Sequence, residues 1–125
     1  AASWTNISDR NLKHSIRDIP VGLDFVKKLK PVEYIYKNAN NNQKTFGFIA
    51  QDVQEVVKEA GLNPNILVAN FSEEGILGLR TTELISVLTK AIQEQQQEIE
   101  NLKDELKTYK TLEERIKVLE QNSSN

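Results

Sequence analysis

The spacing of apolar residues changes near residue 81. Before it, short apolar runs are separated by Pro, Gly and Asn, whereas after it one apolar stripe continues for about forty residues without Gly or Pro. Interrupted runs are typical of short helices and strands, and an unbroken stripe with steps of three and four is typical of one long helix. We therefore expect an α+β fold, with a small globular head over 8–80 and a coiled-coil helix over 81–121.

Within the head, the pattern predicts a short helix and two β-hairpins. Residues 1–20 have no sustained period and read as an extended or turning lead-in that ends at Pro20. The apolar spacing then predicts a helix over 21–29 that ends before Pro31, and alternation predicts a strand over 32–37. An Asn-rich loop, a returning strand over 45–50, a helix over 51–60 and a second hairpin over 66–80 follow.

Two glycines have distinct expected roles in this part of the chain. Gly61 follows the last apolar residue of the predicted helix and is a good C-terminal stop. Gly47 lies inside a predicted strand, where a glycine marks a bulge or a close approach of another group to the backbone.

The long helix carries a heptad seam, and Thr81 or Thr82 can cap its start. A narrow seam with Glu, Gln and Lys on the other faces favours self-association over the alternative, a long helix folded onto its own head. Ile at a with Leu at d favours two strands, but Gln95 at a d position weakens that preference, so the repeat leaves the copy number open. The seam consists of Ile85, Leu88, Ile92, Gln95, Ile99, Leu102, Leu106 and Tyr109.

The seam loses its heptad regularity near its end. After Tyr109 the apolar residues are Leu112, Ile116 and Leu119, so that two steps of three fall in a row. This stammer is expected to overwind the supercoil locally or to let the last turns splay. Residues 122–125 are expected to form a disordered tail.

Composition narrows the classes of function. The 16 Lys and Arg residues nearly balance 18 Asp and Glu residues, for a net charge of −2, so no nucleic acid or membrane partner is expected. There is no Cys and only one His, His14, so no metal site and no cofactor is expected. The chain also contains no Met, and we expect it to be part of a longer protein, with residues 1–7 the remnant of an upstream segment.

Ser8 and Lys13 are the most suggestive chemical pair. A regular helix would hold side chains five residues apart about 140° from each other, so only a turn or a strand can bring this pair together. A lysine amine serves as general base to a serine hydroxyl only when it is neutral, which requires burial or a nearby positive charge such as Arg10. From spacing alone, Ser8 is equally a turn residue, Lys13 a surface residue and Asp9 a turn or N-cap residue.

The order of several motifs carries more information than any one of them. The segments "SDRNLKHSI", "LKPVEYIY", "FGFIAQDVQEV" and "TTELISVLTKAIQEQQQEIENL" occur in this order from residue 8 to about residue 105. Together they resemble the self-cleaving C-terminal intramolecular chaperone domain of phage endosialidase tailspikes, tail fibres and neck appendages, to which a domain of the myelin regulatory factor is related.

The resemblance implies a homotrimer, a client and a single cut. Ser8 would attack the carbonyl of Ile7 with Lys13 as general base, while Asp9, Gly47 and Gln51 would support the site. Three copies would bring an upstream β-helical client of the same polypeptide into register in the host cell cytoplasm during virion assembly. Self-cleavage between Ile7 and Ser8 would then release the chaperone from the mature particle.

Two other functions remain compatible with the residues. The first is a structural coiled-coil assembly domain in which Ser8 is inert. The second is a conventional Ser–Lys hydrolase acting on outside substrates, although neither a G-x-S-x-G nor an S-x-x-K motif is present.

Overall fold

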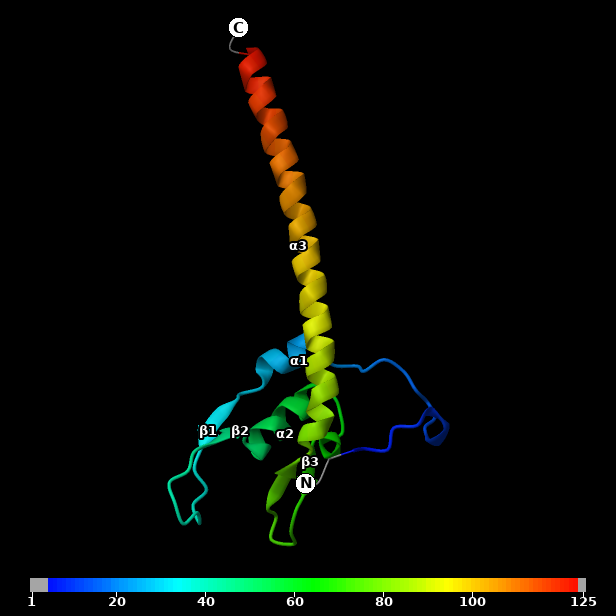
Figure 1. The fold of residues 1–125 in the computed structure, drawn as a ribbon, viewed down its shortest axis with the longest axis vertical. Helices are drawn as coiled ribbons and strands as arrows, with labels where there is room; N and C mark the ends of the chain where they lie inside the picture. The colour runs from blue at the N-terminus through cyan, green and yellow to red at the C-terminus, as the bar shows by residue number, and fades with distance from the viewer. Residues whose placement is uncertain (1–4, 124–125) are drawn as a thin grey trace.

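The computed structural model describes residues 5–123 and has the expected two parts, a small α+β head and one long helix (Figure 1). Residues 1–4 of the predicted upstream remnant and residues 124–125 of the predicted tail lie outside the described residues. The helix rises alone from one end of the head, and both β-hairpins lie at the other end.

A short helix follows the lead-in, as predicted. Residues 5–18 contain one 3₁₀ turn, η1 (Arg10–Leu12), and no other helix or strand, and their backbone bends at Ser15, which has a φ of 55°. Helix α1 (Leu23–Lys28) follows Pro20 and ends before Pro31, since a residue preceding proline is disfavoured in the helical region. Of the predicted apolar residues in this segment, Phe25 is fully buried.

The first hairpin pairs β1 (Val32–Tyr34) with β2 (Thr45–Gly47) in antiparallel register, Val32 opposite Gly47. Both strands are shorter than predicted. Val32 and Tyr34 are half-buried and Glu33 is exposed, which confirms the predicted alternation. The Asn-rich segment is the hairpin loop.

Helix α2 (Ala50–Glu59) ends at Gly61 in a Schellman motif. Gly61 has a φ of 75°, its N–H donates to the carbonyl of Lys58, and the N–H of Leu62 donates to the carbonyl of Val57. Gly61 is thus the predicted stop, because its lack of a Cβ permits the left-handed backbone that closes these two bonds.

The second hairpin leads directly into the long helix. After η2 (Pro64–Ile66), β3 (Val68–Asn70) pairs antiparallel with β4 (Leu77–Leu79), and Gly75, with a φ of 85°, lies in the turn. Arg80 then anchors the chain, since its N–H donates to the carbonyl of Leu67 and its Nε donates to the carbonyl of Asn65. Helix α3 (Thr81–Ser123) begins at Thr81 itself.

Helix α3 is 43 residues long and continues past the predicted end of the coil. Residues 122 and 123, predicted as part of a disordered tail, are helical, because no Gly or Pro interrupts the preceding helix. The disordered-tail prediction was therefore wrong for these two residues.

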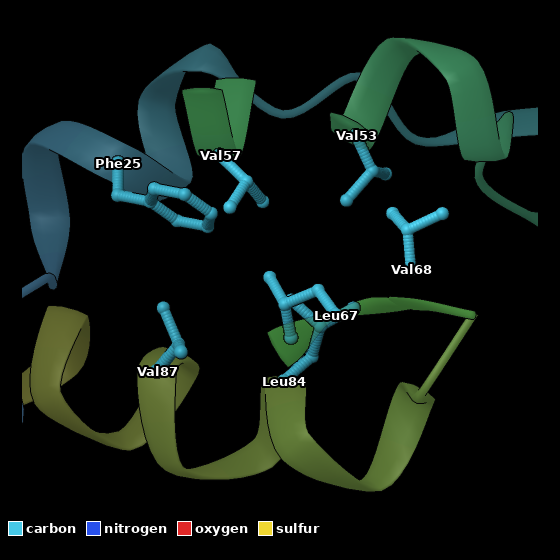
Figure 2. Close-up of a cluster of buried hydrophobic side chains, with 7 residues drawn as sticks. All are labelled: Phe25, Val53, Val57, Leu67, Val68, Leu84 and Val87. Carbon is cyan, nitrogen blue, oxygen red and sulfur yellow. The ribbon is translucent and has the colours of Figure 1, made fainter. Parts of the chain in front are cut away.

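The core lies where α1, α2, β3 and the first three turns of α3 meet (Figure 2). Val53 and Val57 of α2 face Leu84 and Val87 of α3, and Phe25 of α1 covers one side. Among the described residues, the buried apolar side chains are Phe25, Val53, Val57, Leu67 and Val68 of the head and Leu84, Val87 and Ala91 of α3. So few buried side chains make a marginal core, for which association with other copies is a common source of further stability.

Candidate active site and assembly seam

Ser8 and Lys13 meet. Lys13 Nζ donates a hydrogen bond of 2.6 Å to Ser8 Oγ, a short distance for a charge-assisted bond between an amine and a hydroxyl. The sequence left open whether these residues were a pair or two unrelated surface residues. Both come from the same chain, so one copy of the protein supplies both members of the dyad.

The 3₁₀ turn η1 brings the two side chains together. The Asp9 carboxylate accepts a hydrogen bond of 2.9 Å from the Asn11 N–H, and the Lys13 N–H donates to the Arg10 carbonyl over 3.1 Å. Asp9 and Lys13 both have extended backbone on either side of this single turn. The chain therefore folds back on itself between residues 8 and 13, so of the two alternatives that the spacing left, a turn or a strand, the structure has the turn. Asp9 is the N-cap that the sequence predicted as its alternative role.

The dyad is exposed. Every residue from 5 to 18 is exposed, and Figure 1 shows this segment extending away from the head; we call it the arm (residues 5–18). Ile7, which precedes Ser8, is 83% exposed. A general base must accept the hydroxyl proton, and burial favours the neutral amine that can do so. One copy of the chain therefore brings Ser8 and Lys13 into contact, but burial of the Lys13 amine would require another group to pack over the arm.

Gly47 and Gln51 do not join the dyad within one chain. Gly47 lies in β2 and Gln51 in the first turn of α2, and both elements are on the opposite side of α3 from the arm in Figure 1. The glycine at position 47 is explained by a local contact, since a Cβ there would lie 3.1 Å from Tyr34 Cε1. Of the two predicted roles of Gly47, the close approach is therefore confirmed, and the strand register is regular across it.

The ring that approaches Gly47 is part of a tyrosine pair. The hydroxyls of Tyr34 and Tyr36 are 3.2 Å apart, and the rings meet edge to face with centroids 5.1 Å apart. The hydrogen bond with Tyr36 raises the pKa of Tyr34 above its ordinary value, with a smaller contribution from burial. Neither tyrosine was singled out from the sequence, because the alternation of residues 32–37 was explained by a strand alone.

Helix α3 has two apolar faces. Leu84, Val87 and Ala91 point into the head and are buried, whereas Ile85, Leu88 and Ile92 of the seam lie on a different face and are 63%, 40% and 66% exposed. The predicted alternative of a helix folded onto its own head is thus realised on one face of its first turns, while self-association through the exposed seam stays a prediction. Beyond Ala91 every described residue of α3 is exposed, including the rest of the seam at Ile99, Leu102 and Leu106.

Other kinds of site find no support. Among residues 5–123, no group of three or more His, Asp or Glu side chains could hold a metal ion. In that same part of the chain no helix is long and apolar enough to cross a membrane. His14 contacts Ser15, with Nδ1 and Oγ 3.0 Å apart on the arm.

Comparisons with known proteins agree with this arrangement. Residues 8–62 match the model of a protein family described as the chaperone of endosialidase, which is named as a peptidase family. The fold resembles a solved structure titled "Crystal structure of a novel intramolecular chaperon", with a TM-score of 0.59, 24% sequence identity, and coverage of 73% of this chain and 99% of that one. No curated protein matches the chain.

Proposed function

We propose that the chain is an intramolecular chaperone that removes itself by cutting its own backbone between Ile7 and Ser8, because residues 8–62 match the family model described as the chaperone of endosialidase. The observation that supports the cut best is the hydrogen bond of 2.6 Å between Lys13 Nζ and Ser8 Oγ. The family match also begins at Ser8, the first residue after the proposed scissile bond. In this proposal residues 1–7 remain from the client, 8–80 form the chaperone head and 81–121 the coil.

The proposed reaction has two steps. Lys13, once neutral, takes the proton of the Ser8 hydroxyl, and Oγ attacks the carbonyl carbon of Ile7 through a five-membered ring. The bond from the Ile7 carbonyl carbon to the Ser8 nitrogen breaks, Lys13 returns the proton to that nitrogen, and an ester joins Ile7 to Ser8 Oγ. Water then hydrolyses the ester. Because nucleophile and carbonyl belong to adjacent residues, the attack gains an effective molarity of the order of 10⁵ M or more.

The second part of the proposal is assembly into a homotrimer, in which the exposed seam supports association and the family resemblance implies the number of copies. An apolar seam that is 40–66% exposed over more than three heptads is costly in water and is covered when equivalent helices pack on it. Three parallel coils would hold three upstream clients of the same polypeptide in register. We propose a β-helical phage tailspike, tail fibre or neck appendage as the client, assembled in the host cell cytoplasm.

Cutting after assembly has a physical consequence. Once the chaperone leaves the mature particle, the client can lose its register only by crossing its own unfolding barrier, so the assembled fibre becomes kinetically stable.

The test uses the chain joined to its natural upstream segment, as wild type and as Ser8→Ala, Lys13→Ala and Ser15→Ala. Intact mass reports cleavage, and sedimentation equilibrium reports the oligomer. We expect the wild type and the Ser15→Ala control to split before Ser8, the other two variants to stay whole, and all four to be trimers. If all four remain whole trimers, the protein is an assembly module with an inert serine. Monomers would contradict both functions.

A further inference from the structure

One seam residue differs from all the others in chemistry. The heptads that begin at Ile85, Ile92 and Ile99 place Leu88, Gln95 and Leu102 at their d positions. Apart from Gln95, these heptads have Ile at every a position and Leu at every d position. A partner shifted by one heptad would therefore meet an almost identical apolar surface, displaced by about 10 Å along the axis.

The three consecutive glutamines of α3 behave differently in the structure. Gln97 Nε2 donates to Asn101 Oδ1 over 3.0 Å and Gln96 Nε2 lies 3.5 Å from Glu100 Oε1, both four residues ahead on the same helix. Four residues from Gln95 lie Ala91 and Ile99, which offer no polar side chain. Gln95 is exposed and makes no side-chain hydrogen bond within the described residues, and Glu98, three residues ahead, is the one polar side chain among its neighbours three and four residues away.

Burying an amide without a hydrogen-bond partner costs free energy, whereas burying it with a partner does not. A glutamine amide carries donors and an acceptor, so equivalent glutamines from parallel helices can donate in turn around the axis. The Gln95 amides can form these hydrogen bonds with one another only when the helices are in register. In a coil shifted by one heptad, Gln95 faces Leu88 or Leu102 of the neighbouring chains, and its amide is buried unpaired.

We infer that Gln95 sets the register of the assembled α3 helices, with a second copy of this chain as its partner. This inference rests on the proposed association of the helices and names the residue that aligns them. A single polar residue inside an apolar coiled-coil seam specifies alignment at some cost in stability. Without Gln95, the a and d positions from Ile85 to Leu102 would not distinguish the correct alignment from a shifted one.

The test uses the full chain, which has no Cys of its own. Two single-cysteine chains of different mass, Ile92→Cys and Ile99→Cys, are mixed and equilibrated with a thiol–disulfide redox buffer, in three backgrounds: wild type, Gln95→Leu and Gln97→Leu. Gln97 lies on the opposite face of α3, so its variant controls for the same substitution outside the seam. A disulfide between positions 92 and 99 forms only in chains shifted by one heptad. In aligned chains, position 92 of one helix is about 10 Å along the axis from position 99 of its neighbour, whereas the two Cα atoms of a disulfide are less than about 7 Å apart.

We expect the mixed 92–99 disulfide only in the Gln95→Leu background, with disulfides between like positions in the other two. If the mixed disulfide is absent from Gln95→Leu as well, the heads align the helices and Gln95 does not, while the proposed function stands. If the mixed disulfide forms in the wild-type background, Gln95 does not enforce the register. If the wild-type chain sediments as a monomer, both the proposed function and this inference fail.

Discussion

The carboxylate of Glu94 on α3 accepts a hydrogen bond of 3.1 Å from the backbone N–H of Leu23, the first residue of α1, which lies 71 positions earlier in the chain. This contact is close enough to exclude any side chain at Gly22, since a Cβ there would overlap Glu94 Oε1 and approach Lys90 Cγ to 2.9 Å. Gly22 is buried as a result. One carboxylate thus caps α1 and joins it to the long helix.

Gly22→Ala is expected to displace the Glu94 carboxylate and to lower the free energy of unfolding by about 1.5–3 kcal/mol, the usual contribution of a hydrogen bond to a charged group. Urea unfolding at one fixed protein concentration measures it, and Glu98→Ala, one turn further along the exposed helix, is the control. Glu94→Ala removes the same bond, so adding Gly22→Ala to it should cost almost nothing more. Additive losses would show that Gly22 acts independently of Glu94.

The contribution of the two Val57 methyl groups to the free energy of unfolding can be tested directly. Val57 is completely buried between α1, α2 and α3. Val57→Ala removes two methyl groups and leaves a cavity, and we expect a loss of about 2 kcal/mol in the free energy of unfolding. Val118→Ala on the exposed part of α3, where Val118 is 55% exposed, should change it by less than about 0.5 kcal/mol. Equal losses would mean that the end of α3 is as tightly packed as the core.

Much of the fold follows from local signals in the sequence. Gly61 predicted the end of α2 because a left-handed residue there is a matter of backbone sterics alone. Pro31 likewise predicted the end of α1. The contact of Glu94 with α1 could not be predicted in this way, because it joins residues far apart in the chain and an exposed Glu in a helix has no distinguishing local pattern.

The dyad was predictable only in part. Spacing excluded a helix between Ser8 and Lys13 and left a turn or a strand, of which the structure has the turn, η1. The resemblance to a family, and not the spacing, distinguished the pair from two surface residues. Gly47 and Gln51 followed from the resemblance alone, and one chain leaves them on the far side of α3 from the arm.

The Asp9 cap on η1 can be tested for its effect on the contact between Ser8 and Lys13. Asp9→Ala removes the acceptor for the Asn11 N–H and should destabilise the turn by about 1 kcal/mol, which lowers the fraction of chains with Ser8 and Lys13 in contact. If the chain cleaves itself as proposed, the single-turnover rate should fall about fivefold. Asp9→Asn keeps an acceptor oxygen and should cleave at nearly the wild-type rate. A rate for Asp9→Asn as low as that of Asp9→Ala would assign the effect to the charge and not to the cap.

The final prediction concerns the oligomeric state of a chain with a charge in the seam. Ile92 is 66% exposed in the single chain, and packing of equivalent helices would bury three such side chains in one layer. Ile92→Lys would put like charges within that layer, so we expect the chain to sediment as a monomer while the far-ultraviolet circular dichroism of the head is retained. Gln97→Lys, the same added charge on the opposite face, should leave the oligomer intact. Because the marginal head core gains stability from association, the monomeric variant should also unfold at a lower temperature than the control. If Ile92→Lys assembles like the wild type, the helices do not meet along this seam, and the register assigned to Gln95 would have no interface on which to act.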